Sequence, residues 1–142
     1  MKNKVIEELK RIASEHAGLL QPATVVEEAR PVSSPLHEHF EWDDSQAAEK
    51  YRIQQARQLI TVCVETLPGS TGETPIFVSL SPDRLRDKGG YRLVAQVLTD
   101  KASKEQMLLD AQAEMEVFQK KYQRLRELAA VFRAMRAVTK KK

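Results

Sequence analysis

The sequence contains one cysteine and no long hydrophobic run, and both scarcities exclude classes of protein. Cys63 alone cannot form an intramolecular disulfide or a cysteine-based zinc site, and a lone thiol fits a reducing compartment. The first 18 residues carry seven charged side chains, so they lack the apolar core of a signal peptide. No apolar run approaches membrane-spanning length. We therefore expect a cytoplasmic protein with no membrane partner.

Sequence motifs of catalysis and cofactor binding are also missing. The pair Gly89 and Gly90 lacks the companion residues of a phosphate-binding loop or a dinucleotide-binding turn. Cys63 falls in a β-branched segment, where a single thiol is usually a small buried hydrophobe and not a nucleophile. We expect no catalytic residues and no cofactor, and hence a binding protein instead of an enzyme.

The loop from Ser34 to Asp44 combines histidines, carboxylates and two aromatic residues. His37 and His39 with the nearby acids could ligate a divalent metal, because imidazole and carboxylate oxygen suit zinc or manganese. The alternative is that the acids lie at the positive N-terminus of the next helix, while Phe40 and Trp42 anchor the loop on the core. The spacing matches no known metal motif, so we favour the second interpretation and predict no metal.

The periodicity of apolar residues predicts an α+β, mostly helical fold. Helices are expected over residues 4–17, ended by Gly18, and 22–30, with Pro22 at the first position. A third helix, capped by one of residues 43–45, runs to about Ile60, and these three form a unit that resembles a helix-turn-helix. Its expected buried side consists of Ala48, Tyr51, Ala56, Leu59 and Ile60.

The middle of the chain has the β-branched alternation that is typical of strands. Residues 62–66 and 76–80, separated by a turn rich in Pro, Gly, Ser and Thr, predict a β-hairpin. Residues 81–90 read as a polar loop, and residues 91–98 give no clear assignment. We expect two domains: a helical plus β-hairpin domain over 1–100 and a long C-terminal helix with a basic tail over 101–142.

The C-terminal helix is predicted over residues 103–138, with Ser103 and Gln106 as a capping box. It would be about 50 Å long at 1.5 Å per residue. Its apolar residues alternate three and four apart and form a coiled-coil seam: Leu108, Ala111, Met115, Phe118, Tyr122, Leu125, Ala129 and Phe132. This seam can pack on other helices of the chain, form a homo-oligomer or belong to a projecting arm. A parallel homodimer is disfavoured because Lys121 would face Arg126 of the second chain.

Positive charge is concentrated at the C-terminus. From Gln119 onward nine basic residues oppose one acid, Glu127, so this segment carries a net charge of +8 within a chain whose total is +3. Such a polarised chain attracts phosphates or acidic protein surfaces to one end. This pattern favours nucleic-acid binding, because Lys and Arg neutralise phosphates whatever the base sequence. It is not specific for it, because Lys and Arg also favour the C-terminal ends of helices.

Candidate nucleic-acid contacts fall in three groups. The third helix carries Lys50, Gln54 and Arg57 along one face, with Arg52 and Gln55 beside it. These residue types can hydrogen-bond base edges, although an ordinary polar helix face is the favoured explanation. The second helix is a poorer recognition helix, because Glu27 and Glu28 repel phosphates. The other groups are cations of the polar loop and of the C-terminal helix: Arg84, Arg86, Lys88 and Arg92, then Arg124, Arg133, Arg136 and Lys140.

The segment Ser34-Pro35-Leu36-His37, followed by residues 40–44 (Phe-Glu-Trp-Asp-Asp), resembles a family of small uncharacterised proteins encoded by bacteriophages and prophages. Residues 47–60, 19–30 and 90–92 are also similar to this family. The resemblance implies a phage protein made in the cytoplasm of a bacterial host, and it implies no particular activity or site residues.

Two functional hypotheses follow. The first is a phage-encoded DNA-binding accessory or regulatory protein that is a homo-oligomer through its C-terminal helix. The second is a protein-interaction module, such as a phage assembly factor or an inhibitor of a host protein. They differ in whether DNA, or a single host or phage protein, is the partner.

Overall fold

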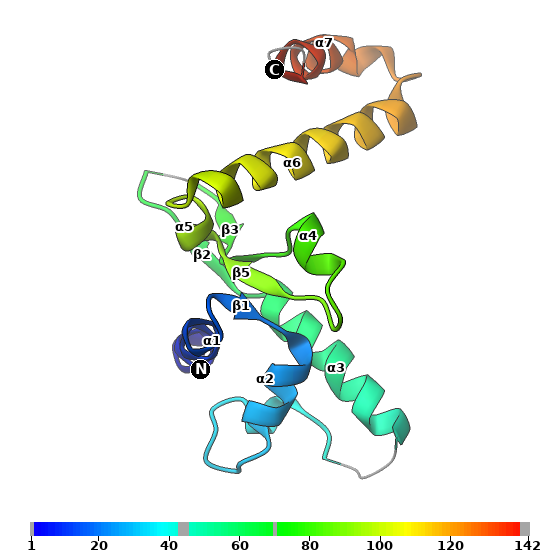
Figure 1. Cartoon of the computed structure of the whole chain (residues 1–142). Helices are drawn as coiled ribbons and strands as arrows, with labels where there is room; N and C mark the ends of the chain where they lie inside the picture. Colours follow the sequence, from blue (N-terminus) through cyan, green and yellow to red (C-terminus); the bar gives the residue numbers. More distant parts are fainter. Residues whose placement is uncertain (1, 43–45, 70, 140–142) are drawn as a thin grey trace. The chain divides into compact units, whose positions relative to one another are not determined.

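The computed structural model describes residues 2–42, 46–69 and 71–139 (Figure 1). The chain divides into two compact units, Met1–Asp100 and Lys101–Lys142. The fold is α+β and mostly helical, with two small sheets and a long helix in the C-terminal unit. Within the described residues, no helix has both the length and the apolar character needed to span a bilayer.

Helix α1 (Lys2–Glu15) buries one apolar face in the core of the first unit. Leu9 and Ile12 are fully buried and Val5 nearly so, as their helical spacing predicts. The helix ends where the backbone turns left-handed, at Ala17 (φ 55°) and Gly18 (φ 81°). The Gly18 N–H donates to the Ala13 carbonyl at 2.8 Å, which closes the helix end.

Helices α2 (Pro22–Ala29) and α3 (Gln46–Thr61) pack against each other. Pro22 occupies the start of α2, as predicted, and Val25, Val26 and Ala29 are fully buried. The short 3₁₀ turn η1 (His37–His39) interrupts the loop between the helices. The predicted caps of α3, residues 43–45, lie outside the described residues.

The buried face of α3 differs from the prediction at its N-terminal half. Ala56 and Ile60 are buried as expected, but Tyr51 is 55% exposed, and the charged Arg52 is buried in its place. Arg52, Ala56 and Ile60 are four residues apart and share one face. Arg52 is accepted there because Glu49 and the Glu41 carbonyl bind its guanidinium, at 2.8 Å each.

The predicted hairpin exists, but the prediction placed its second strand at the wrong residues. Strand β2 (Val64–Thr66) pairs antiparallel with β3 (Glu73–Pro75), so the turn is shorter than expected. Residues 77–78 form β4 (Phe77–Val78) in a different sheet, of order β1-β5-β4, together with β1 (Leu19–Leu20) and β5 (Tyr91–Leu93). The pattern of side chains showed that these segments are strands but could not show which strands pair.

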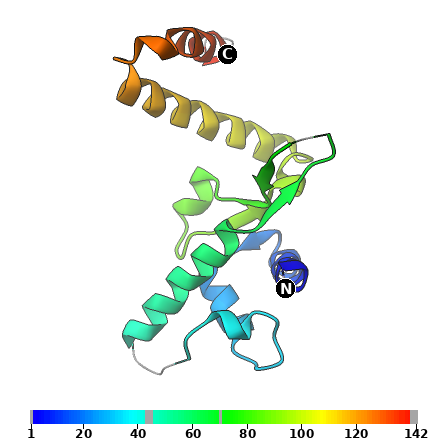
Figure 2. The same cartoon turned by 180° about the vertical axis from the view of Figure 1, so that it is seen from behind.

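The antiparallel three-stranded sheet joins the beginning and end of the first unit. Leu19 is opposite Arg92, and Phe77 is opposite Leu93. A side chain at Gly90 would place its Cβ 2.5 Å from Leu19 Cδ1, so glycine allows β1 and β5 to approach. Two short helices, α4 (Ser81–Arg84) and α5 (Val94–Val97), flank β5 in sequence (Figure 2). The segment 81–90 is therefore not wholly a loop, and residues 91–98 are a strand followed by a helical turn.

The C-terminal unit is a helical hairpin and not one rod. The long helix α6 (Lys101–Tyr122) ends sixteen residues before the predicted limit, and the turn η2 (Arg126–Leu128) leads into α7 (Ala129–Thr139). The helix also starts at Lys101, two residues before the predicted capping box. At Leu125 the backbone is extended (φ −82°, ψ 99°), which breaks the helix.

The hairpin is closed by aromatic residues from the predicted seam. Phe132 of α7 is only 4% exposed and meets Phe118 of α6 edge to face, with 6.1 Å between ring centroids. Phe118 also contacts Tyr122 at 5.0 Å. The expected unbroken helix is wrong because Phe132 is buried against Phe118 within the unit, a possibility that periodicity alone does not reveal. Other seam residues remain exposed, Leu108 at 55% and Leu125 at 47%.

Candidate nucleic-acid interface

The C-terminal hairpin forms a shallow cleft of about 330 Å³ that we call the arginine cleft. Three arginines line it, Arg126 from η2 and Arg133 and Arg136 from α7, together with Gln119 and Gln123. Arg133 and Arg136 are three residues apart and therefore lie on the same side of α7. The buried Phe132 forms the apolar floor that holds α7 in this position.

The cations of the arginine cleft have no acidic partner among the described residues. Arg126, Arg133 and Arg136 are exposed, and the ion pair found within residues 101–139 joins Lys120 to Glu116, at 3.6 Å. Guanidinium groups bind phosphate oxygens through two parallel N–H bonds, and unpaired ones do so without first losing an internal partner. The cleft therefore presents an uncompensated positive surface.

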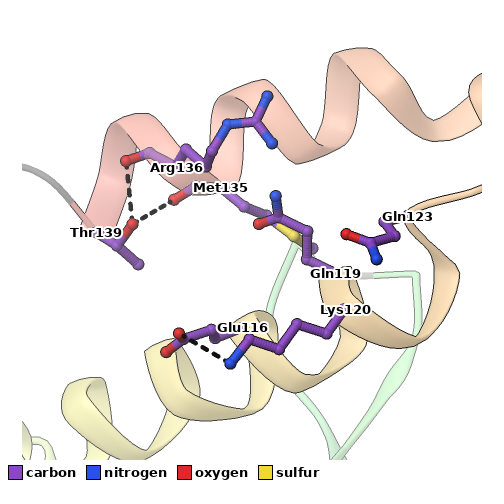
Figure 3. A pocket seen from close by; sticks show the side chains of 7 residues that line it. All are labelled: Glu116, Gln119, Lys120, Gln123, Met135, Arg136 and Thr139. Carbon is purple, nitrogen blue, oxygen red and sulfur yellow. Dashed lines mark hydrogen bonds and ion pairs between the residues drawn. The ribbon is translucent and has the colours of Figure 1, made fainter.

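A neighbouring cleft of about 420 Å³ shares Gln119, Gln123 and Arg136 with the arginine cleft (Figure 3). Met135 and Thr139 of α7 also line this second cleft. The Thr139 hydroxyl donates to the carbonyls of Met135 and Arg136 at 3.3 and 3.0 Å. The two glutamines carry amide groups that both donate and accept hydrogen bonds. The surface around Arg136 thus combines a cation with neutral donors, and the same cleft is also lined by the ion pair of Lys120 with Glu116.

The predicted cations of the polar loop have a different environment. Asp83 of α4 is 2% exposed, and Arg92 of β5 binds both of its carboxylate oxygens, at 2.6 and 2.9 Å. This bond raises the pKa of Arg92 above its ordinary value. Arg86 lies 3.7 Å from the same carboxylate, and Arg84 donates to the Ser79 carbonyl at 2.6 Å. The acid at position 83 therefore offsets this cluster, and Lys88 remains exposed beside it.

Of the contact residues predicted on α3, three are exposed and one is buried. Lys50, Gln54 and Arg57 are exposed, as a contact surface requires. Arg52 is wrong as a surface contact, because its side chain is only 4% exposed and is held by Glu49. The hydrogen bond from Arg52, followed by the charges of Arg30 and Arg52, lowers the pKa of Glu49.

Large polar side chains pack around the ring of Trp42 in the loop before α3. Its ring stacks on His37 at 5.0 Å, and Arg30 and Arg52 lie over it at 5.5 and 5.3 Å. The Trp42 indole N–H donates to the His37 carbonyl at 2.9 Å. This arrangement stabilises the loop through cation–π and stacking contacts, in agreement with the anchoring role predicted for the aromatic residues.

His39 lies in a separate pocket of the first unit. It lines an apolar pocket of about 90 Å³ with Cys63 and Val5, and its Nε2 is buried without a hydrogen-bond partner in the described structure. The nearest carboxylate oxygen, of Glu38, is 3.9 Å away. In the described part of the chain, no three His, Cys, Asp or Glu residues are grouped as metal ligands would be.

The arginine cleft contains residues that sequence reasoning did not select. Arg133 and Arg136 were predicted contacts, Arg124 is exposed outside the cleft, and Lys140 lies outside the described residues. Gln119 and Gln123 were missed, and Arg126 was counted among the basic residues of the C-terminal helix but not selected as a contact, because a straight helix would place all three along a rod and not around a turn. Comparison with protein-family models, curated proteins and solved structures found no match.

Proposed function

We propose that the protein binds duplex DNA through the arginine cleft and acts as an accessory or regulatory factor that associates with itself through its C-terminal unit. The observation that carries the first part is the group of three exposed arginines without acidic partners, Arg126, Arg133 and Arg136. Phosphates of DNA bind such groups with release of counterions, which favours association independently of sequence.

The distribution of ion pairs supports this choice of surface. In the first unit, Arg11 pairs with Glu8, Glu15 and Glu28, and Arg30 pairs with Glu27 and Glu49. These cations already interact with carboxylates, so they contribute less to an external phosphate than unpaired arginines do. Exposed Lys50, Gln54 and Arg57 on α3 are a second, smaller contact surface in this proposal. An origin in a phage or prophage rests on the resemblance of the sequence alone.

The test is binding of fluorescent duplex DNA across a salt series. We expect the logarithm of the association constant to fall linearly with the logarithm of salt concentration, by about 0.9 for each phosphate contacted. The three arginines alone then give a slope of about −3. An affinity that does not change with salt, or no binding near physiological salt, would contradict the proposal.

A protein-interaction module is the second candidate, because large apolar side chains of the first unit are exposed. Leu85 is 89% exposed between two arginines, and Val32 is 83% exposed. Exposed apolar residues flanked by cations suit an acidic protein partner. This candidate predicts that changing Leu85 to serine abolishes capture of one host or phage protein, whereas reversing the charge of Arg133 and Arg136 does not.

A further inference from the structure

The turn of the C-terminal hairpin is made by residues that favour helix. Residues 101–142 contain no glycine and no proline, and the break occurs at Gln123, Arg124 and Leu125. Sharp breaks in helices are generally caused by proline, glycine or an inserted group, and Gln, Arg and Leu are strong helix formers. Local preference therefore favours a continuous helix, and the hairpin exists because Phe132 is buried against Phe118.

The seam is symmetric about the break. Phe118 lies seven residues before Leu125, and Phe132 lies seven residues after it. If two continuous helices cross antiparallel at Leu125, Phe118 of each chain lies opposite Phe132 of the other, because heptad spacing keeps them on one face. The aromatic contact of the hairpin is then made twice between chains, and the exposed Leu125 residues meet at the centre.

Charges and flanking apolar residues agree with the same alignment. Glu114 and Arg136 are each eleven residues from Leu125, so opposite charges lie at the same level along the antiparallel pair. Met115 and Met135, both half-buried in the hairpin, are each ten residues from Leu125 and also lie at the same level.

We propose that the seam of the C-terminal unit binds a second copy of the chain by exchange of α7. In the exchanged dimer the turn at 123–125 becomes helical, and α7 of each chain packs on α6 of the other. Exchange keeps the closing contacts of the hairpin and removes the unfavourable turn, which is why short hinges promote it. This inference rests on the self-association part of the proposed function and not on DNA binding, since the arginine cleft belongs to the closed hairpin, whose turn the exchange straightens.

A proline at position 126 distinguishes the closed hairpin from the exchanged dimer, because only the hairpin tolerates it. Arg126 is the first residue of η2, and Leu125 before it has the extended backbone that proline requires, so Arg126→Pro is compatible with the hairpin. In a continuous helix the same proline removes a hydrogen bond and clashes with the preceding turn. Arg126→Ala is the matched control, because it removes the same charge and leaves both forms accessible.

We expect the wild type and Arg126→Ala to form dimers in a concentration series followed by light scattering. Arg126→Pro is expected to weaken dimerisation at least about a hundredfold, the effect of an interior helix proline. Equal dimerisation of the proline and alanine variants, or a wild type that stays monomeric at all concentrations, would overturn the exchange.

Cross-linking distinguishes exchange from side-by-side association of closed hairpins. Chains with Met115→Cys are mixed with chains with Met135→Cys, both with Cys63→Ala, and treated with a short bismaleimide. Exchange predicts a covalent dimer that joins one chain of each kind, whereas a dimer without this product would exclude it. If this product forms and DNA does not bind, the exchange stands and only the DNA-binding proposal fails.

Discussion

Changing Arg126, Arg133 and Arg136 together to glutamate is expected to lower the affinity for duplex DNA by roughly three orders of magnitude at about 0.1 M salt. Three phosphate contacts with a slope of about −0.9 each are worth roughly this factor between 1 M and 0.1 M salt. The side chains are exposed and have no acidic partner in the described structure, so the fold should tolerate the change. Fluorescence anisotropy with a labelled duplex measures the loss.

The control for this variant makes an equal change of net charge at residues outside the arginine cleft. Lys4, Lys101 and Lys104 are exposed cations outside both proposed contact surfaces, and their joint change to glutamate alters the net charge by the same amount. We expect this control to weaken binding far less than the cleft variant. Equal losses in the two variants would show that total charge, and not the arginine cleft, governs binding.

Replacing Asp83 with alanine is expected to destabilise the first unit by about 3 kcal/mol, because it leaves a partly buried cation without its partner. Asp83 is 2% exposed, and it holds Arg92 of strand β5 through two short hydrogen bonds. The carboxylate therefore fixes α4 against the three-stranded sheet. Urea unfolding followed by the fluorescence of Trp42, the single tryptophan, reports this unit.

Arg86→Ala is the matched control for Asp83, since Arg86 is exposed and lies 3.7 Å from the same carboxylate. An exposed ion pair contributes at most about 1 kcal/mol, so this variant should unfold close to the wild type. If Asp83→Ala unfolds at the same urea concentration as Arg86→Ala, the buried pair does not stabilise the unit as described.

The first three helices of the first unit could be predicted because their apolar spacing has one interpretation, whereas the short helices α4 and α5 were not predicted. Val5, Leu9 and Ile12 must share a face in any helix, and Pro22 marks a helix start wherever it occurs in such a context. Strand pairing could not be predicted, because β4 can pair with any neighbouring edge. Its partner β5 was identified only when the fold brought Phe77 opposite Leu93.

The candidate site shows a second limit of sequence reasoning. Formal charge does not tell which cations are already paired, so Arg52 and Arg92 looked equivalent to Arg133. Their partners, Glu49 and Asp83, come from the same or neighbouring elements but become visible only when burial is known. The break at Leu125 was hidden for another reason: every residue around it favours the helix that the structure interrupts.

The most direct measurement of the central claim is a map of amide chemical shifts of the full chain as duplex DNA is added. We expect the largest shifts at the residues that surround the arginine cleft: Gln119, Gln123, Arg126, Arg133 and Arg136. Smaller changes are expected along Lys50, Gln54 and Arg57 of α3. Shifts confined to residues 2–100, or no shifts near physiological salt, would contradict the assignment of the cleft as the DNA-binding surface.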